Sequence, residues 1–208
     1  MITFKNVSKV FEGREVLSDL SLEINKNEFV SIIGPSGAGK TTVLNLMGLL
    51  MRPDGGSVEI AGVENPSPKA VQKLRRYNFG YIFQNFVLME NETVLENLKL
   101  SKKYNPNWTD QLVNETIELV GLNETFLKKK VYQLSGGEQQ RIAIARVLLK
   151  PCDIILADEP TGNLDAVNKE AILAIFKKLK SLGKTVVCVT HDPSMAEQSD
   201  RIIQLQKV

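Results

Sequence analysis

Short runs of alternating hydrophobic and polar residues dominate the first 33 positions of the chain, and this pattern predicts a series of β-strands. Polar turns at 12–14 and 25–28 interrupt the runs, because glycine, asparagine and charged residues gather there. The last run, residues 29–33, is apolar and rich in β-branched residues, which is typical of a buried strand. The chain therefore begins with a β-rich segment that ends in a buried strand.

Strand and helix patterns follow one another through the rest of the chain. Further strands are predicted at 57–62, 80–83, 154–157, 185–189 and 201–205. Helices are predicted from about residue 43 to a turn at 53–56, at 69–76, and at 171–182, where Gly183 supplies the C-cap. Between 91 and 149 the pattern changes to helices, one of which carries Val113, Ile117 and Val120 at helical spacing. This order predicts an α/β nucleotide-binding core that carries a helical insert.

Composition and charge narrow the class of protein. The 208 residues suit one α/β domain, and a net charge of +2 makes no strong electrostatic case for nucleic acid as a partner. The lysine runs at 102–103 and 128–130 are expected to be solvated surface. Cys152 and Cys188 lie in apolar surroundings without metal-binding spacing, which fits a reducing compartment. No signal peptide is expected at Met1–Lys5, and no apolar run reaches the roughly 18 residues that a membrane span needs.

A glycine-rich stretch between the buried strand and the first helix matches the pattern G-x-x-x-x-G-K-[ST]. A polyphosphate carries dense negative charge, and a helix N-terminus offers free N–H groups and a positive dipole end. Lys40 is expected to reach the β- and γ-phosphates of a bound nucleotide, and the Thr41 hydroxyl to bind Mg²⁺. The residues expected to contact the nucleotide in this stretch are Gly34, Ser36, Gly37, Ala38, Gly39, Lys40, Thr41 and Thr42.

Two later segments add to the predicted site. The strand at 154–157 runs into Asp158 and Glu159, and active sites of parallel sheets lie at the carboxyl ends of strands. We expect Asp158 to hold Mg²⁺ through a water and Glu159 to polarise the attacking water. Further back in the sequence, Ser135 and Glu138 form an S-x-x-E capping box at the start of a helix. The two glycines at 136–137 favour a second anion-binding helix end there.

These motifs, in this order, make the chain resemble the ATP-binding subunit of an ABC transporter over nearly its full length. The glycine loop resembles the family's Walker A motif, Leu134–Glu138 its signature motif, and Ile154–Glu159 its Walker B motif with the catalytic glutamate. Four further positions match the Q-loop glutamine, the D-loop, the switch histidine and the aromatic residue that stacks on adenine, namely Gln84, Gly162–Asp165, His191 and Phe11. Within the family, Phe83–Phe86 and Pro160–Asp165 resemble a subgroup that serves lipoprotein release, macrolide or peptide efflux, and cell division.

The resemblance implies a P-loop NTPase core of mostly parallel strands flanked by helices, with an N-terminal antiparallel β-subdomain and a helical signature subdomain. The core and β-subdomain would comprise 1–84 and 150–208, and the helical subdomain about 85–149. Two copies would form a homodimer on ATP binding, with each ATP between the Walker A of one and the signature of the other. The resemblance implies that phosphate and Mg²⁺ are bound by Lys40, Thr41, Gln84 and Asp158. It implies that Glu159 handles the attacking water and that His191 contacts the γ-phosphate. The contacts across the dimer would come from Ser135, Gly136, Gly137 and Asp165.

The resemblance also implies a separate integral-membrane permease subunit, met at the cytoplasmic face of a bacterial-type cell membrane. The apolar stretch Asn85–Met89 stands where the family has a groove for a cytoplasmic helix of that subunit; alternatively, its side chains only pack the helical subdomain. A soluble ABC-type ATPase of DNA repair, chromosome structure or translation is a second hypothesis, and a non-enzymatic scaffold is a third. The second is disfavoured by the single cassette and by the lack of a long heptad run or zinc-ligand cluster between Lys40 and Asp158. The third is disfavoured because Lys40, Asp158, Glu159 and His191 are all present.

Overall fold

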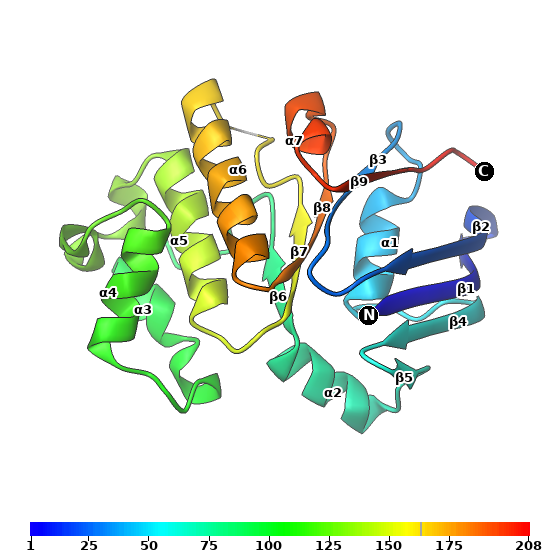
Figure 1. Ribbon diagram of the computed structural model, residues 1–208, viewed down its shortest axis with the longest axis horizontal. Helices are drawn as coiled ribbons and strands as arrows, with labels where there is room; N and C mark the ends of the chain where they lie inside the picture. Colours follow the sequence, from blue (N-terminus) through cyan, green and yellow to red (C-terminus); the bar gives the residue numbers. More distant parts are fainter. Residues whose placement is uncertain (163) are drawn as a thin grey trace.

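The computed structural model describes residues 1–162 and 164–208, and two β-sheets organise this part of the chain (Figure 1). One sheet is antiparallel, in the order β2-β1-β4-β5, with bounds β2 (Arg14–Ile24), β1 (Ile2–Phe11), β4 (Gly55–Ile60) and β5 (Val63–Glu64). The other is parallel, in the order β6-β7-β8-β3-β9, with bounds β6 (Phe79–Ile82), β7 (Ile154–Asp158), β8 (Thr185–Val189), β3 (Phe29–Ile33) and β9 (Arg201–Gln204). The predicted α/β fold, with a parallel core and an N-terminal antiparallel sheet, is confirmed.

The parallel sheet is covered on both faces, and the alternation of side chains along β7 explains how. Ile154 and Leu156 pack with the antiparallel sheet and helix α1 (Lys40–Met47), whereas Ile155 and Ala157 pack with the helices on the other side. Successive side chains of a strand point to opposite faces, so an unbroken apolar run serves two cores at once. Figure 1 shows α1 and the antiparallel strands on one side of the sheet, and α5 (Gly136–Leu148) and α6 (Ala166–Ser181) on the other.

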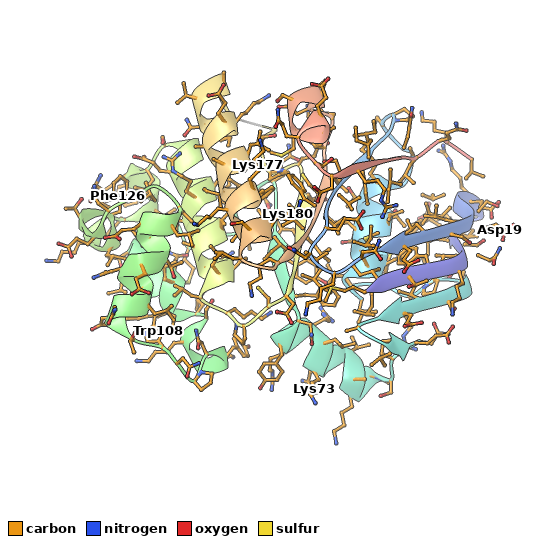
Figure 2. The ribbon with its side chains drawn as sticks, viewed as in Figure 1. Asp19, Lys73, Trp108, Phe126, Lys177 and Lys180 are labelled. Carbon is orange, nitrogen blue, oxygen red and sulfur yellow. The ribbon has the colours of Figure 1, made fainter. Side chains whose placement is uncertain are left out.

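Helices α3 (Val94–Lys99) and α4 (Asp110–Leu119) lie beyond α5 in Figure 1, away from the antiparallel sheet. Val94, Val113 and Ile142, one from each of three helices, belong to the same buried cluster as the face of the parallel sheet. Trp108, labelled at the edge of this region in Figure 2, packs partly buried against that cluster. The α-helices after α1 are α2 (Pro68–Tyr77), α3 (Val94–Lys99), α4 (Asp110–Leu119), α5 (Gly136–Leu148), α6 (Ala166–Ser181) and α7 (Pro193–Glu197); the short 3₁₀ turns are η1 (Lys102–Tyr104), η2 (Glu124–Lys128) and η3 (Val131–Gln133).

Several boundaries differ from the sequence prediction. Helix α1 ends at Met47, well before the turn at 53–56, because Gly48 caps it and Leu49 adopts a left-handed φ of 58°. Helix α6 begins at Ala166, not at 171, because the Asp165 side chain accepts a hydrogen bond from the Asn168 N–H; it ends at Ser181, before Gly183. Helix α7 is too short to leave a periodic signal and was not predicted. Within the described residues, no helix is long and apolar enough to cross a membrane.

Candidate nucleotide-binding and catalytic site

The glycine loop leaves the carboxyl end of β3 and opens helix α1, as the sequence predicts. Gly39 caps the helix with a left-handed φ of 82°, and a Cβ atom added there would lie 2.8 Å from the Leu17 side chain. Both conditions exclude other residues without strain. No side chain caps the start of α1, so its first N–H groups remain for another acceptor. An anion is the natural acceptor at such a helix end.

Lys40 lies folded against the inside of this loop. Its ammonium donates hydrogen bonds to the carbonyl oxygens of Gly34, at 2.9 Å, and Pro35, at 3.1 Å. These bonds keep the charge near the loop, where phosphate oxygens would be stronger acceptors than neutral carbonyls. The ammonium is therefore placed to exchange the two carbonyls for phosphate.

Thr41 and Asp158 meet across the cleft between α1 and the end of β7. The Thr41 hydroxyl lies 3.4 Å from a carboxylate oxygen of Asp158. Burial raises the pKa of the Asp158 carboxyl, although the Thr41 hydroxyl and the Lys40 charge act against the rise. A raised pKa marks a carboxylate whose negative charge is not fully compensated, and a bound cation would compensate it.

This hydroxyl and carboxylate fit Mg²⁺ of the kind that accompanies nucleotides. No group of three or more His, Cys, Asp and Glu side chains among the described residues could hold a metal ion alone. Nucleotide-site Mg²⁺ does not need such a group, since it is held by one or two carboxylates together with water and substrate phosphates. Asp158 and Thr41 supply donors of this type beside the phosphate loop.

Glu159 and His191 are in direct contact at the same edge of the sheet. The imidazole Nδ1 of His191 lies 2.8 Å from a carboxylate oxygen of Glu159, and its backbone N–H donates to the same oxygen at 3.3 Å. Glu159 itself has a left-handed φ of 47°, and such strain in a non-glycine residue is common at functional sites. The predicted catalytic carboxylate and switch histidine are thus brought together by two strand ends, β7 and β8.

Asp192 supports the histidine from the start of α7. One of its carboxylate oxygens caps the helix through the Ser194 N–H at 3.0 Å, and the other lies 2.9 Å from the Lys169 ammonium. The hydrogen bond from Lys169 is the main reason that the pKa of Asp192 is lowered to about 2. The backbone that carries His191 is therefore held by an ion pair between α6 and α7.

A cleft of about 600 Å³ joins these groups. Most predicted phosphate and catalytic residues line it, and three lining residues were not predicted: Arg14, Val16 and Val189. Arg14 follows the β1–β2 turn, and its place beside the glycine loop depends on how the antiparallel sheet folds over the core. The predicted residues in the lining are Gly34, Ser36, Gly37, Gly39, Lys40, Thr41, Thr42, Asp158, Glu159 and His191.

Other predicted residues lie outside this cleft. Ala38 is buried beneath the loop. Phe11 is 42% exposed at the end of β1, with the Lys9 ammonium 5.4 Å from its ring centre. Gln84 is exposed, and its amide lies near Gly162, where an added Cβ atom would be 3.2 Å from it. Asn163 of the predicted D-loop lies outside the described residues.

The signature segment lies away from the cleft of its own chain, at the start of α5. Ser135 and Glu138 form the predicted capping box, with the Ser135 hydroxyl accepting from the Glu138 N–H. Ser135 and Gly136 are exposed, whereas Gly137 is buried. A Cβ atom at Gly137 would lie 2.1 Å from the Asn168 side chain, so the close approach that requires glycine comes from α6 of the same chain. The sequence pattern suggested that both glycines make room for a ligand. For Gly137, packing against the Asn168 side chain already explains why the position requires glycine.

The segment after Gln84 has an unusual backbone. Phe86 and Val87 follow one another with left-handed φ values of 58° and 51°, although neither is glycine. The Arg146 guanidinium, on α5, donates hydrogen bonds to both of their carbonyl oxygens. Sequence reasoning missed this contact because nothing in the local pattern connects Arg146 to residues 60 positions away.

A buried parallel strand, a glycine loop that opens a helix, and a carboxylate pair ending another strand of the same sheet define a P-loop nucleoside triphosphatase. Residues 17–162 match the ABC transporter family. The chain belongs to this family, as one of its ATPase cassettes.

Relatives of the chain include both short and long proteins. It is 41% identical to the lipoprotein-releasing system ATP-binding protein LolD of Bacteroides thetaiotaomicron, covering 99% of this chain and 96% of LolD. It is 40% identical to the macrolide export ATP-binding/permease protein MacB of Salmonella typhimurium, covering 96% of this chain but only 32% of MacB. The chain thus spans about a third of the length of MacB.

A solved structure has the same fold. The dimeric, post-hydrolysis cassette MJ0796 of Methanocaldococcus jannaschii, bound to ADP and Pi, aligns with a TM-score of 0.88 at 40% identity. The alignment covers 100% of this chain and 96% of that one.

Proposed function

We propose that the chain binds Mg²⁺-ATP in the cleft beside α1 and hydrolyses it as one of two copies that face each other head to tail. Each cycle drives an integral-membrane permease subunit. The observation that carries this proposal is the convergence of an ammonium, a hydroxyl, two carboxylates and an imidazole at one edge of the parallel sheet, namely Lys40, Thr41, Asp158, Glu159 and His191.

The residues in the cleft have distinct roles in this proposal. Lys40 leaves its two carbonyl acceptors and binds the β- and γ-phosphates, while the N–H groups at the start of α1 bind the same oxygens. Asp158 and Thr41 would hold Mg²⁺, joined by Gln84 from outside the cleft, and the ion would neutralise charge on the phosphate oxygens. Glu159 orients the attacking water and accepts its proton, and His191 moves from Glu159 toward the γ-phosphate. Phe11, which lies outside the cleft at the end of β1, stacks on adenine.

Contacts from a second copy complete the site. Ser135 and Gly136 are exposed at the N-terminus of α5, and we propose that they and the Gly137 N–H bind the γ-phosphate of the facing copy. Asp165 belongs to the same surface, because it accepts a hydrogen bond from the Asn168 N–H and the Asn168 side chain packs against Gly137. This arrangement corresponds to a division into a core with its β-subdomain, 1–84 and 150–208, and a helical subdomain at about 85–149.

The membrane partner is inferred from the relatives. LolD is named as the ATP-binding protein of a lipoprotein-releasing system, and MacB as an ATP-binding and permease protein for macrolide export. These names support a permease subunit for lipoprotein release or for peptide or drug efflux, and a place at the cytoplasmic face of the membrane. Val87 and Met89 are exposed, whereas Leu88 packs partly on the helical core, so Val87 and Met89 are the proposed contacts for a partner helix.

The proposal is tested with Glu159→Gln, which keeps the acceptor for the His191 N–H but removes the base. We expect ATP turnover to fall at least about 100-fold, while the variant forms a dimer with ATP and returns to a monomer without it, measured by light scattering after gel filtration. Lys40→Met is the control, because it should neither turn over ATP nor dimerise. Turnover at the wild-type rate in Glu159→Gln would contradict the assigned base, and a monomer at saturating ATP would contradict the paired site.

Contact with the permease is tested separately. Met89→Ser should reduce co-purification with the permease and its stimulation of ATPase activity, while the basal rate of the cassette stays unchanged. Val63→Ser, at a residue of the same 39% exposure on the antiparallel sheet, is the matched control. Full co-purification of the Met89→Ser variant would count against this contact.

A further inference from the structure

Several short stretches of the chain carry positive charge without any carboxylate of their own; in one of them, 171–191, two of the four lysines pair with Asp200 and Asp153. Two others, residues 65–89 and 97–109, hold seven of the 26 Lys and Arg residues and none of the 24 Asp and Glu residues. The remainder, with 19 cations and 24 carboxylates, is net negative. The overall charge of +2 therefore hides a strong separation of charge along the chain.

The fold brings residues 65–89 and 97–109 together. Arg76 of α2 lies 5.6 Å from the ring centre of Tyr104 in η1, and Lys103 lies 4.8 Å from the same ring. Lys150 donates hydrogen bonds to the carbonyls of Arg75 and Phe79, which anchors the C-terminal end of α2 to the core. Helix α2 and η1 thus form one basic surface, which we call the α2 surface; its exposed cations are Lys69, Lys73, Arg75, Arg76, Lys102 and Lys103.

These six cations form no ion pair with any carboxylate of the described residues. Lys180, labelled on α6 in Figure 2, differs, because it pairs with the Asp200 carboxylate. A surface that collects charge without neutralising it internally costs self-repulsion in the free protein. An external anion would remove that cost.

The shape of the α2 surface suits a headgroup. Leu74 is the only residue of α2 that is buried, so the helix stands out at the edge of the molecule, where Figure 2 labels Lys73. A hollow of about 440 Å³ on its outer side is lined by Lys69, Lys73 and Arg76 together with polar side chains and Tyr77. Tyr77 is 44% exposed, and Leu100, just before η1, is 49% exposed. Cations and a tyrosine therefore line one hollow on α2, and an exposed apolar side chain lies beside η1 in the sequence.

We propose that the α2 surface binds the anionic phospholipid headgroups of a bilayer. Clustered Lys and Arg side chains are attracted to anionic lipid at about 1 kcal/mol each, and tyrosine and leucine suit the boundary between headgroups and acyl chains. A bilayer accounts for both the charges and the exposed apolar groups, whereas an acidic protein segment accounts only for the charges. The net negative remainder of the chain is repelled by the same membrane, so the field also orients the cassette with α2 toward the lipid.

This inference rests on the proposed function only for its setting, the cytoplasmic face of a membrane. It adds a direct lipid contact to the contact with the permease. The α2 surface lies outside the ATP cleft, so its cations are not part of the catalytic machinery.

The test is sedimentation of the full chain with large vesicles of phosphatidylcholine, with and without about 30 mol % phosphatidylglycerol. We expect binding only to the anionic vesicles, and its loss when salt is raised from about 0.05 M to about 0.5 M. The variant Lys69→Gln/Lys73→Gln/Arg76→Gln should partition about 100-fold less. The matched control is Lys128→Gln/Lys129→Gln/Lys130→Gln, which removes the same charge near Phe126, far from Lys73 in Figure 2, and should bind like wild type.

Three results would overturn the inference. Wild-type protein that fails to sediment with anionic vesicles at low salt excludes a lipid surface and leaves an acidic protein as the partner. An equal loss of vesicle binding in both triple variants would show that binding responds to net charge alone and not to the α2 surface. Equal binding to vesicles with and without phosphatidylglycerol would show that headgroup charge does not attract the protein.

ATP turnover, measured without vesicles on the same samples, reports the proposed function independently. Protein that hydrolyses ATP but does not bind vesicles refutes only the lipid contact, and wild-type protein that binds vesicles but does not hydrolyse ATP refutes only the hydrolysis.

Discussion

Two loops at the same edge of the parallel sheet use left-handed backbone in opposite ways. The phosphate loop, after β3, places Gly37 and Gly39 at φ values of 80° and 82°. The segment after β6 places Phe86 and Val87 at 58° and 51°. Glycine adopts this conformation freely, whereas it costs other residues about 1–2 kcal/mol each. The phosphate loop therefore adopts its backbone conformation without strain, whereas the segment after β6 needs other contacts to keep its strained conformation.

The Arg146 guanidinium keeps Phe86 and Val87 in this conformation. Its planar fork donates to the two carbonyls of the strained pair, and it belongs to α5, the helix whose first turn is the signature segment. A shift of α5 against the sheet would release these bonds and let Phe86 and Val87 relax. The phosphate loop is thus free of backbone strain at its glycines, whereas the strained segment after Gln84 is tied to the signature helix by hydrogen bonds.

The largest effect is expected at the phosphate loop. Lys40→Met should lower ATP affinity about 10- to 100-fold, because a charge-assisted contact to the phosphates is lost. The melting temperature of the nucleotide-free protein should fall by no more than about 4 °C, since only the two hydrogen bonds from Lys40 to the loop carbonyls are lost. Calorimetric titration with ATP and a thermal melt check both parts, and unchanged affinity would contradict the phosphate site.

Gly39→Ala tests whether the phosphate loop needs glycine. The new Cβ would meet the Leu17 side chain at 2.8 Å in a left-handed conformation. We expect a loss of about 2 kcal/mol in the free energy of unfolding, measured with urea. Gly183→Ala, where an added Cβ atom has nothing within 4 Å at the same φ of 82°, isolates the backbone part of that cost. Equal losses in the two variants would show that packing against Leu17 contributes nothing.

Arg146→Lys tests the role of the Arg146 guanidinium. A single ammonium cannot replace the fork, so one carbonyl of the pair loses its donor, and unfolding should become easier by about 1 kcal/mol. Stimulation by the permease should fall more than the basal ATP turnover, because the segment after Gln84 is no longer held. The matched comparison is Arg141→Lys, which changes an arginine of the same helix whose guanidinium bonds to Asn168 instead. Equal effects of both changes on stimulation would count against a specific role of Arg146.

The smallest effect is expected at Val87. Val87→Gly removes the strain of a β-branched residue at φ 51°, and Val87 is 52% exposed, so little packing is lost. The free energy of unfolding should rise by up to about 1 kcal/mol, less the entropy that glycine adds to the unfolded chain. Val87→Ala keeps the strain and serves as the control. Adding Val87→Gly to Arg146→Lys should restore the free energy of unfolding, and a lack of recovery would contradict strain relief as the role of Arg146.

Local patterns in the sequence determined much of this protein. The glycine loop between strand and helix, the capping box of Ser135 and Glu138, and Asp158 and Glu159 at a strand end were all predicted where the structure has them. Each depends on neighbours within a few positions, through backbone periodicity or a helix cap. Helix ends were predicted less well, because one left-handed residue such as Leu49 ends α1 without a sequence signal of its own.

Only the tertiary structure decided which distant groups share a surface. It placed Arg14 in the ATP cleft, Asn168 against Gly137, and the Arg146 guanidinium on the strained pair after Gln84. It also joined two basic stretches into one face through Arg76 and Tyr104. A sequence lists charges and hydrogen-bonding groups in order along the chain, whereas their interaction depends on distance in space. That distance is set by how the helices and the two sheets pack.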